Sequence, residues 1–399
     1  MTTRPTAWIS AAGVASPSGS SLGRLWRSAL EGRISISESE SFAPDSYASS
    51  LAGQVSDFDA AEVPGRLKPT TDRSTQLALI AAKRALEALP DRYADGDPYL
   101  RSIVTANSAG GYAFGERELR NMYLHGPKYV STAQSYAWFY AVNTGQLSIR
   151  YGFKGRCSTV VADSAGGLDA IAQGTELIQQ GQQLVLAGSV ESALSPLAWV
   201  SLESTGRLTS SKAPEASYLP FDKRASGIVP AEGGALLALT PEPIGDGASS
   251  IGVLGHARTM TVNEPQEASL ERTIRKALDA ASLEPVDIDV VFADAAGVFE
   301  DDIAEANALA AVFGARKVPV TAPKAGFGRT ASGMGPLDTV LAALALRTKI
   351  IPPTPAVSIS DELPIRIETA PVRVPTMRHA LVIARGLPIF TSALVIGIR

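Results

Sequence analysis

The residue best placed to do chemistry in this sequence is Ser164. It stands in the turn 163–166, between an apolar segment typical of a buried strand, 159–162, and a helical segment, 167–179. A serine in such a turn is held near the backbone N–H groups that start the helix, an arrangement that serves nucleophiles in hydrolases. The turn departs from the hydrolase pattern Gly-x-Ser-x-Gly, because Ala162 stands at the first glycine position. Ser164 is therefore interpreted as a structural or vestigial residue, with a nucleophile as the alternative.

The sequence offers no base for that serine and no set of metal ligands. A serine nucleophile needs a general base, but the three histidines, His125, His256 and His379, stand far apart and in no recognisable motif. The single cysteine, Cys157, excludes an internal disulfide and a multi-cysteine metal site. It begins an apolar segment, and we expect it to be buried and chemically inert. No metal site is predicted.

The composition is that of a globular protein without an electrostatic signature for nucleic acid. Of 399 residues, 45% are hydrophobic and 19% charged, and the net charge of -4 comes without a long basic run. The apolar opening segment ends in a Gly/Pro/Ser turn, which predicts a first strand and not a signal peptide. No window approaches the roughly 20 consecutive apolar residues that a spanning helix needs. We expect a cytoplasmic protein that binds neither nucleic acid nor a membrane.

Short apolar runs alternate with amphipathic segments along the chain, which predicts an α/β fold. The clearest helix should run from about Asp72 to Leu89, with Pro90 as its stop signal. The stretch 241–250, PEPIGDGASS, has the composition of a linker. The boundary between an N-terminal half, 1–245, and a C-terminal half, 246–399, is placed within it. Strands are expected at 7–13, 102–107, 159–162, 184–188, 235–239, 290–293 and 380–384.

Several long segments resemble, in the same order, the β-ketoacyl synthases of the thiolase fold. They are 220–224 (PFDKR), 231–234 (AEGG), 137–146 (AWFYAVNTGQ), 166–169 (GGLD) and 318–324 (VPVTAPK). Nearly the whole chain takes part, and it is most similar to the chain length factor, the ketosynthase-like β subunit of type II polyketide synthases. The resemblance implies a thiolase-like fold: two similar α/β halves in a layered α-β-α-β-α arrangement, with helices between and outside the stacked sheets.

The resemblance also shows that the catalytic residues of a working ketosynthase are lost. Such an enzyme uses a cysteine at the turn and two histidines, and this chain has Ser164, Ala296 and Arg329 at those positions. Alanine has no side-chain donor and arginine is permanently protonated, so neither replaces an imidazole as a base. Chain length factors usually carry a glutamine where Ser164 stands, and a hydroxyl lacks the two-sided hydrogen bonding of an amide. That difference argues against a priming decarboxylation. The resemblance further implies a structural ion pair between Glu305 and Lys324.

By this resemblance the chain is a subunit without catalysis of its own. A catalytic ketosynthase α subunit would supply the cysteine and histidines for decarboxylative condensation of malonyl groups. These groups arrive on the phosphopantetheine arm of an acyl carrier protein, so no cofactor is implied. This subunit would complete the interface tunnel that receives the growing chain. Two alternatives stay open: an independent Ser164-dependent acyltransferase or hydrolase, and a heterodimer that makes a reduced linear polyene instead of an aromatic polyketide.

In the family, the positions that match Tyr112, Gly115, Leu119 and Leu197 gate that tunnel at the subunit interface. The first three are spaced three and then four residues apart, as on one face of a helix, although a core-facing stripe would have the same spacing. Members that make shorter aromatic chains tend to carry bulkier residues at these positions, so the residues found here predict an open tunnel and a long product. The aromatic stretch 136–140 is a candidate for the subunit interface, with core packing as the alternative.

Overall fold

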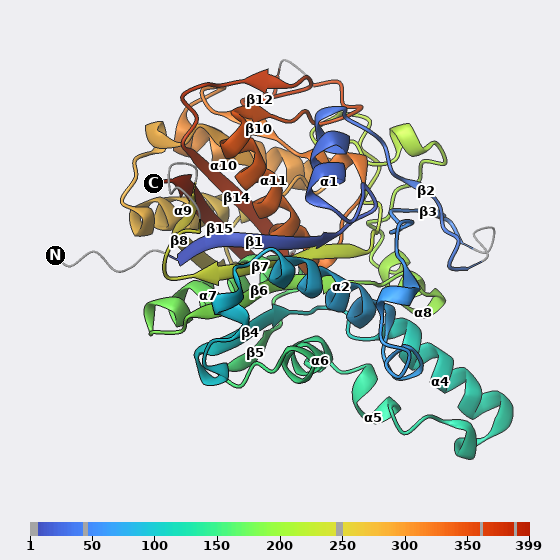
Figure 1. Ribbon diagram of the computed structural model, residues 1–399. Helices are drawn as coiled ribbons and strands as arrows, with labels where there is room; N and C mark the ends of the chain where they lie inside the picture. The colour runs from blue at the N-terminus through green and yellow to red at the C-terminus, as the bar shows by residue number, and fades with distance from the viewer. Residues whose placement is uncertain (1–6, 43–46, 245–249, 360–361, 387–388) are drawn as a thin grey trace.

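The structure, a computed structural model, describes residues 7–42, 47–244, 250–359, 362–386 and 389–399 (Figure 1). Its helices are α1 (Leu22–Leu30), α2 (Arg73–Glu87), α3 (Asp91–Ala94), α4 (Tyr112–His125), α5 (Gln134–Ala137), α6 (Val142–Tyr151), α7 (Gly166–Gln179), α8 (Pro196–Glu203), α9 (Gln266–Ala281), α10 (Phe299–Phe313) and α11 (Met334–Thr348). Its strands are β1 (Ala7–Ala15), β2 (Ser37–Glu38), β3 (Leu51–Ala52), β4 (Arg101–Ala106), β5 (Cys157–Val160), β6 (Leu184–Glu191), β7 (Gly233–Thr240), β8 (Ile251–Met260), β9 (Val290–Phe292), β10 (Pro319–Thr321), β11 (Ile350–Ile351), β12 (Arg366–Ile367), β13 (Val372–Arg373), β14 (His379–Gly386) and β15 (Phe390–Ile398). Each of the seven strands expected from the sequence corresponds to one of these, as do both helices, so the prediction of alternating elements is confirmed.

One sheet of eleven strands runs through the described chain in the order β12-β10-β9-β14-β15-β8-β1-β7-β6-β4-β5. The strands of the first half occupy one side of this order and those of the second half the other. The two sides join where β1 pairs with β8 in antiparallel fashion, with Ala7 opposite Val253 and Ile9 opposite Ile251. Each half therefore contributes its own part of the sheet, and their junction is made by the first strand of each half.

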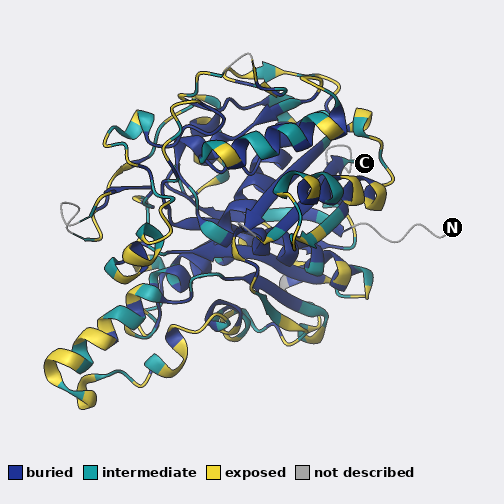
Figure 2. Ribbon diagram, turned by 180° about the vertical axis from the view of Figure 1, so that it is seen from behind, coloured by how far each residue is buried: buried dark blue, intermediate teal, exposed yellow. Residues whose placement is uncertain are grey.

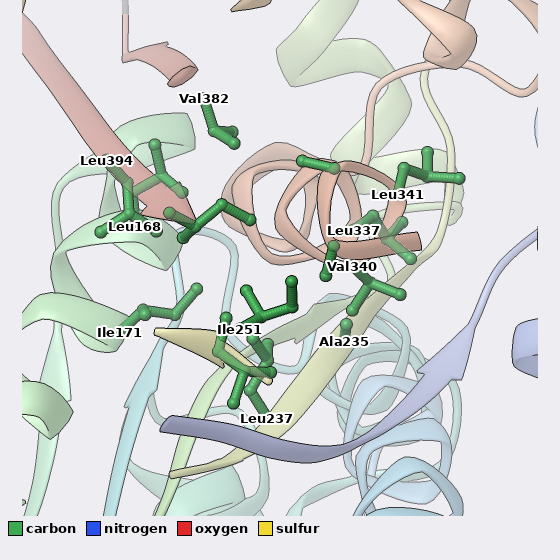
Figure 3. Close-up of a cluster of buried hydrophobic side chains, with 14 of the residues drawn as sticks. Leu168, Ile171, Ala235, Leu237, Ile251, Leu337, Val340, Leu341, Val382 and Leu394 are labelled. Atoms are coloured by element: carbon green, nitrogen blue, oxygen red, sulfur yellow. The ribbon is translucent and has the colours of Figure 1, made fainter. Parts of the chain in front are cut away.

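The helices are arranged in three layers about this sheet. Helices α7 and α11 lie between its two parts, where Leu168 and Leu337 meet Leu237 from one part and Leu394 from the other (Figure 3). Helices α2 and α6 cover the outer face of the first part, and α9 and α10 cover that of the second. The order from one side of the molecule to the other is α-β-α-β-α, as the thiolase-like prediction required. The dark interior in Figure 2 follows these layers.

Close backbone contact fixes α2 against the sheet. Gly13 lies in β1 where an added Cβ would come within 1.8 Å of the Ala81 carbonyl oxygen of α2, so no larger residue fits. Helix α2 begins after Asp72, whose Oδ1 accepts a hydrogen bond from the Ser74 amide at 2.9 Å. The other oxygen of Asp72 accepts one from the Phe114 amide at 2.9 Å. One carboxylate therefore joins the starts of α2 and α4.

Helices α4 and α5 form an arm that extends away from the layers (Figure 1). Figure 2 shows much of this arm in the colour of exposed residues. The predicted boundary between the halves, at 245/246, lies outside the described residues and stays a prediction. Within the described ranges, no helix has the length and apolar character needed to cross a bilayer.

Candidate functional site

The three positions predicted to have lost catalytic residues line one cavity of 290 Å³. Ser164 comes from the short helix Asp163–Ala165 between β5 and α7, Ala296 from the loop after β9, and Arg329 from the loop before α11. The structure thus brings together residues from both halves of the chain. Much of the remaining wall is apolar and includes Ala109, Ala193, Ala198, Leu202, Ile228 and Ala331.

The turn that carries Ser164 is tightly packed and strained. Asp163 has a φ of 47°, in the left-handed region that residues other than glycine rarely adopt. A Cβ on Gly167 would come within 2.1 Å of the Ser332 carbonyl oxygen, so the start of α7 lies directly against the second half. Burial raises the pKa of the Asp163 carboxyl, against the attraction of Arg329. The turn that carries Ser164 is therefore held in a strained conformation by its packing against the second half.

Ser164 has no partner that could activate it. The residue is buried, and its hydroxyl makes no hydrogen bond within the described ranges. None of the three histidines is among the described residues that line the cavity. His256 instead contacts Asp169 at 3.1 Å and Ser392 at 2.9 Å. A serine without a base is a poor nucleophile, so the geometry favours the structural interpretation.

Arg329 is held as a structural cation. Its Nη2 donates to Asp294 Oδ1 at 2.9 Å, and its Nη1 donates to the Asp294 carbonyl oxygen at 2.7 Å. Arg385, buried in β14, donates from Nε to Asp294 Oδ2 at 3.2 Å. Although burial raises the pKa of Asp294, attraction to Arg329 and Arg385 outweighs that effect and holds it far below its usual range. The second histidine position of an active ketosynthase is here part of a buried salt bridge.

The expected ion pair between Glu305 and Lys324 is wrong, because the structure gives each a different partner. Glu305 Oε2 accepts from Arg385 Nη2 at 3.0 Å. Lys324 Nζ pairs with Asp338 of α11, and both side chains are completely buried. Glu305 and Lys324 do approach the same backbone: Glu305 accepts the Asp294 amide at 2.8 Å, and Lys324 donates to the Asp294 carbonyl oxygen at 3.2 Å. Both side chains thus hydrogen-bond to the loop after β9, Glu305 while paired with Arg385 and Lys324 while paired with Asp338.

Sequence reasoning missed four charged residues at or beside the cavity. Glu191, Asp294 and Arg385 each stand in or directly after an apolar strand, where charged residues are rare unless they are paired. A charged residue in or directly after an apolar strand was the signal from which the sequence could have identified these three. Burial raises the pKa of Glu191 to about 7, against hydrogen bonds from Ser332 and Ser108 that lower it. The fourth residue, Arg207, lies in a loop after α8 and carried no such signal.

The four predicted gate residues lie on two neighbouring helices. Tyr112, Gly115 and Leu119 are on α4 and Leu197 is on α8, and the helices are joined by a 3.0 Å hydrogen bond from the Leu197 amide to Glu116. Leu119 is 41% exposed and Leu197 43%, and Tyr112 lines the cavity. The buried residues of α4 are Phe114 and Glu118. The predicted gate therefore does not coincide with the core-facing stripe of α4, and its role stays a prediction.

The chain exposes a row of aromatic side chains that begins in α5 of the arm and continues beyond it. Tyr136, Trp138, Phe139 and Tyr140 are all exposed, Trp138 by 49%, so the row is not packed in the core. Cys157 is exposed as well, which corrects the expectation that it is buried. The reason is its strand: β5 is the last strand of the sheet order and therefore an edge, which the sequence does not reveal.

The chain matches one protein family in both of its parts. The N-terminal domain of β-ketoacyl synthases matches residues 7–243, and the C-terminal domain matches residues 249–358. An actinorhodin polyketide β-ketoacyl synthase 2 from Streptomyces coelicolor is 45% identical over 399 residues, 97% of each chain. The tetracenomycin polyketide synthase ketoacyl synthase β subunit from Streptomyces glaucescens is 42% identical over 401 residues, again 97% of each chain.

Solved structures agree in fold. The ishigamide ketosynthase/chain length factor superposes with a TM-score of 0.89 at 21% identity and covers all of both chains. A type II polyketide synthase carrier protein in complex with its hexaketide-bound ketosynthase gives a TM-score of 0.87 at 23% identity, with the same coverage. At these identities the likeness concerns the fold alone. With the closely similar sequences, it establishes that the chain belongs to the β-ketoacyl synthase family and, within it, to the ketosynthase β subunits, or chain length factors, of type II polyketide synthases.

Proposed function

We propose that the chain is the non-catalytic subunit of a ketosynthase heterodimer and shapes the tunnel that sets polyketide chain length. The observation that carries the proposal is the cavity, in which Ser164, Ala296 and Arg329 come together without an imidazole or a thiol. Condensation needs an acylated nucleophile and a group that handles the proton and the malonyl carboxylate. A partner must supply both, and the catalytic α subunit is that partner.

Two exposed features of the surface support the proposal that a partner subunit binds this chain. An edge strand, β5, lies at the end of the sheet, and the exposed aromatic row Tyr136–Tyr140 belongs to the segment that leads from the arm to the strand. Exposed aromatic clusters are typical of interfaces. The substrate would reach the heterodimer on the phosphopantetheine arm of an acyl carrier protein, so the proposal needs no cofactor of this chain. A cytoplasmic location goes with this role.

Co-expression tests the proposal. The chain with a catalytic ketosynthase subunit and a carrier protein should form a heterodimer that releases polyketides of defined length, whereas the chain alone should form none. Mass analysis of the products also decides between an aromatic product and a reduced linear polyene. If the purified chain hydrolysed acyl thioesters without a partner, the Ser164-dependent acyltransferase or hydrolase would be the better account.

A further inference from the structure

The wall of the cavity carries more charge than its three altered positions explain. The charged side chains that line it are Asp163, Glu191, Arg207, Arg329 and Arg385. Burial raises the pKa of both carboxyl groups, that of Glu191 to about 7, and so favours their neutral forms. The guanidinium groups stay charged at any pH that the fold survives. The wall is therefore cationic.

The carboxyl groups behind the wall pair with these guanidinium groups. Asp294 lies between Arg329 and Arg385, Asp301 pairs with Arg207, and Glu305 pairs with Arg385. Three guanidinium groups thus face three carboxyl groups.

The other charged groups near the cavity are also buried or paired. Burial raises the pKa of Asp302 to about 7 and raises that of Glu305, which lies 3.0 Å from Arg385. Lys324 and Asp338 balance each other. The arginines that line the cavity are therefore paired from behind, and a ligand would have to use the guanidinium donors that these pairs leave open.

Arg207 has hydrogen-bonding capacity to spare. Its Nη2 donates to Asp301, but its Nε and Nη1 have no partner within the described ranges. The Arg207 side chain is 34% exposed, whereas those of Arg329 and Arg385 are almost enclosed. Its backbone is fixed, because the Ile228 amide donates to the Arg207 carbonyl oxygen at 2.8 Å. Arg207 thus lines the cavity from a fixed loop, and part of its guanidinium group is open to further hydrogen bonds.

The rest of the cavity fits an apolar chain. Leu202 and Ile228 line it together with several alanines, and the hydroxyl of Ser164 has no partner there. Its volume of 290 Å³ is near the lower limit, roughly 300 Å³, of the pockets that hold small molecules. A ligand with a short chain would fill it.

We propose that the cavity binds a small carboxylate with a short apolar chain, whose carboxylate is held by the open donors of Arg207. Guanidinium groups suit this task because their planar donors match the two oxygens of a carboxylate. The chain of the ligand replaces water against the apolar wall. The cavity that lost its catalytic groups is, on this account, a binding site in its own right. It does not depend on the proposed function.

The test uses hexanoate as the anionic probe and hexanol as its neutral counterpart. Crystals of the heterodimer are soaked with a hexanoate that carries bromine on its terminal carbon, and the anomalous bromine signal shows whether the probe lies in this cavity or in a site of the partner. Titration calorimetry then gives the affinities. We expect a bromine peak between Arg207 and the alanine wall, and hexanol bound at least about tenfold more weakly than hexanoate, because hydrogen bonds to charged groups are strong.

Variants of this chain assign the binding to the cavity. Arg207→Gln removes the charge, and Ala296→Leu fills the space; each should weaken hexanoate binding at least about tenfold. Arg207→Lys keeps the charge and should retain part of the affinity. Arg272→Gln is the matched control, because Arg272 pairs with Glu264 at a similar exposure of 39% and is not among the residues that line the cavity. It should leave binding unchanged.

Several results would overturn the proposal: no bromine peak in the cavity, equal affinities for hexanoate and hexanol, or unchanged affinity in both Arg207→Gln and Ala296→Leu. If Arg207→Gln fails to fold, the effect of Ala296→Leu and the difference in affinity between hexanoate and hexanol still test the proposal. The outcome is also separable from that of the proposed function. A chain that binds hexanoate but never pairs with a ketosynthase would uphold this inference and defeat the other.

Discussion

At the scale of single residues, the site is characterised by which of its side chains can accept or release a proton. Among the described residues the Ser164 hydroxyl has no hydrogen-bond partner, none of the three histidines lines the cavity, and Arg329 is paired with Asp294. Burial raises the pKa of Glu191, which lines the cavity, to about 7. Its Oε1 accepts three hydrogen bonds, from the Ser108 amide and hydroxyl and from the Ser332 hydroxyl. From these contacts we expect Ser164 to have no function in the reaction and Glu191 to affect the stability of the protein.

Replacing Ser164 by alanine should leave chain elongation by the heterodimer within about twofold of the parent, because an unassisted hydroxyl contributes little as a nucleophile. Product formation per heterodimer is the measurement, with sizing chromatography to show that assembly is intact. A loss of several orders of magnitude in an intact heterodimer would reveal a chemical role for Ser164.

Replacing Glu191 by glutamine should stabilise the protein at alkaline pH, and the gain should shrink toward zero as the pH falls below the ordinary pKa of 4.5. The folded pKa of Glu191 is raised to about 7, so the stability that this group contributes is present at low pH and is lost as pH rises through 7. Glutamine keeps the acceptor oxygen and avoids the buried charge. We expect a gain on the order of 3 kcal/mol at pH 8, since the pKa is raised from 4.5 to about 7 and one pKa unit corresponds to about 1.4 kcal/mol.

Thermal unfolding of the two proteins at pH 5.5 and pH 8 measures this effect. The other buried carboxyl groups are present in both proteins, so they cancel in the difference. A constant difference across this pH range would show that Glu191 does not titrate as described.

The residues that could be predicted from sequence are those fixed by a local motif. Ser164, Ala296 and Arg329 meet at one cavity because each stands in a segment whose neighbours specify the turn. The partner of Lys324 could not be predicted, because Asp338 reaches it from α11, and only the packing of that helix decides which carboxylate is near. The exposure of Cys157 was missed for a similar reason, since the order of strands in a sheet depends on contacts distant in sequence.

At the scale of elements, helices α4 and α8 both contribute residues to the wall of the cavity. Glu116 of α4 accepts the hydrogen bond from the Leu197 amide at the start of α8, and Arg120 lies 3.5 Å from the same carboxylate group. A Cβ on Gly115 would meet only the Trp138 side chain, at 3.6 Å, so there is room for a larger residue there. A larger side chain at Gly115 can therefore be accommodated without forcing the backbone apart.

The double variant Gly115→Thr with Leu119→Phe should shorten the product, because added volume on this face of α4 narrows the space available to the growing chain. Product length by mass spectrometry is the measurement. Leu124→Phe, in the last turn of the same helix, is the matched control and should leave the length distribution unchanged. An assembled double variant with the parent's products would show that these positions are not the gate.

At the scale of the whole molecule, the exposed edge and the exposed aromatic row indicate that the chain is one part of an assembly. An unpaired edge strand and a cluster of exposed aromatic side chains are liabilities in a protein that works alone. They are accounted for if a partner covers them.

The isolated chain should aggregate or self-associate, and the ketosynthase partner should prevent this. Light scattering of the chain with and without its partner is the measurement. Cys157, the only cysteine of the chain and an exposed one, provides a second measurement: a maleimide should label it rapidly in the isolated chain and much more slowly in the heterodimer. A stable monomer whose Cys157 is labelled equally fast with and without the partner would contradict the pairing.

The position of β1 in the sheet has a consequence for the order in which the protein is made. Residues 7–15 are made long before their neighbours in the sheet, which are β7, beginning at Gly233, and β8, beginning at Ile251. Until β7 is made, near the end of the first half, this apolar strand lacks the neighbours that it has in the folded sheet. Contacts so distant in sequence slow folding and expose surfaces that aggregate. We therefore expect this strand to be a point at which the growing chain can aggregate, and removing it would leave the two halves without their junction.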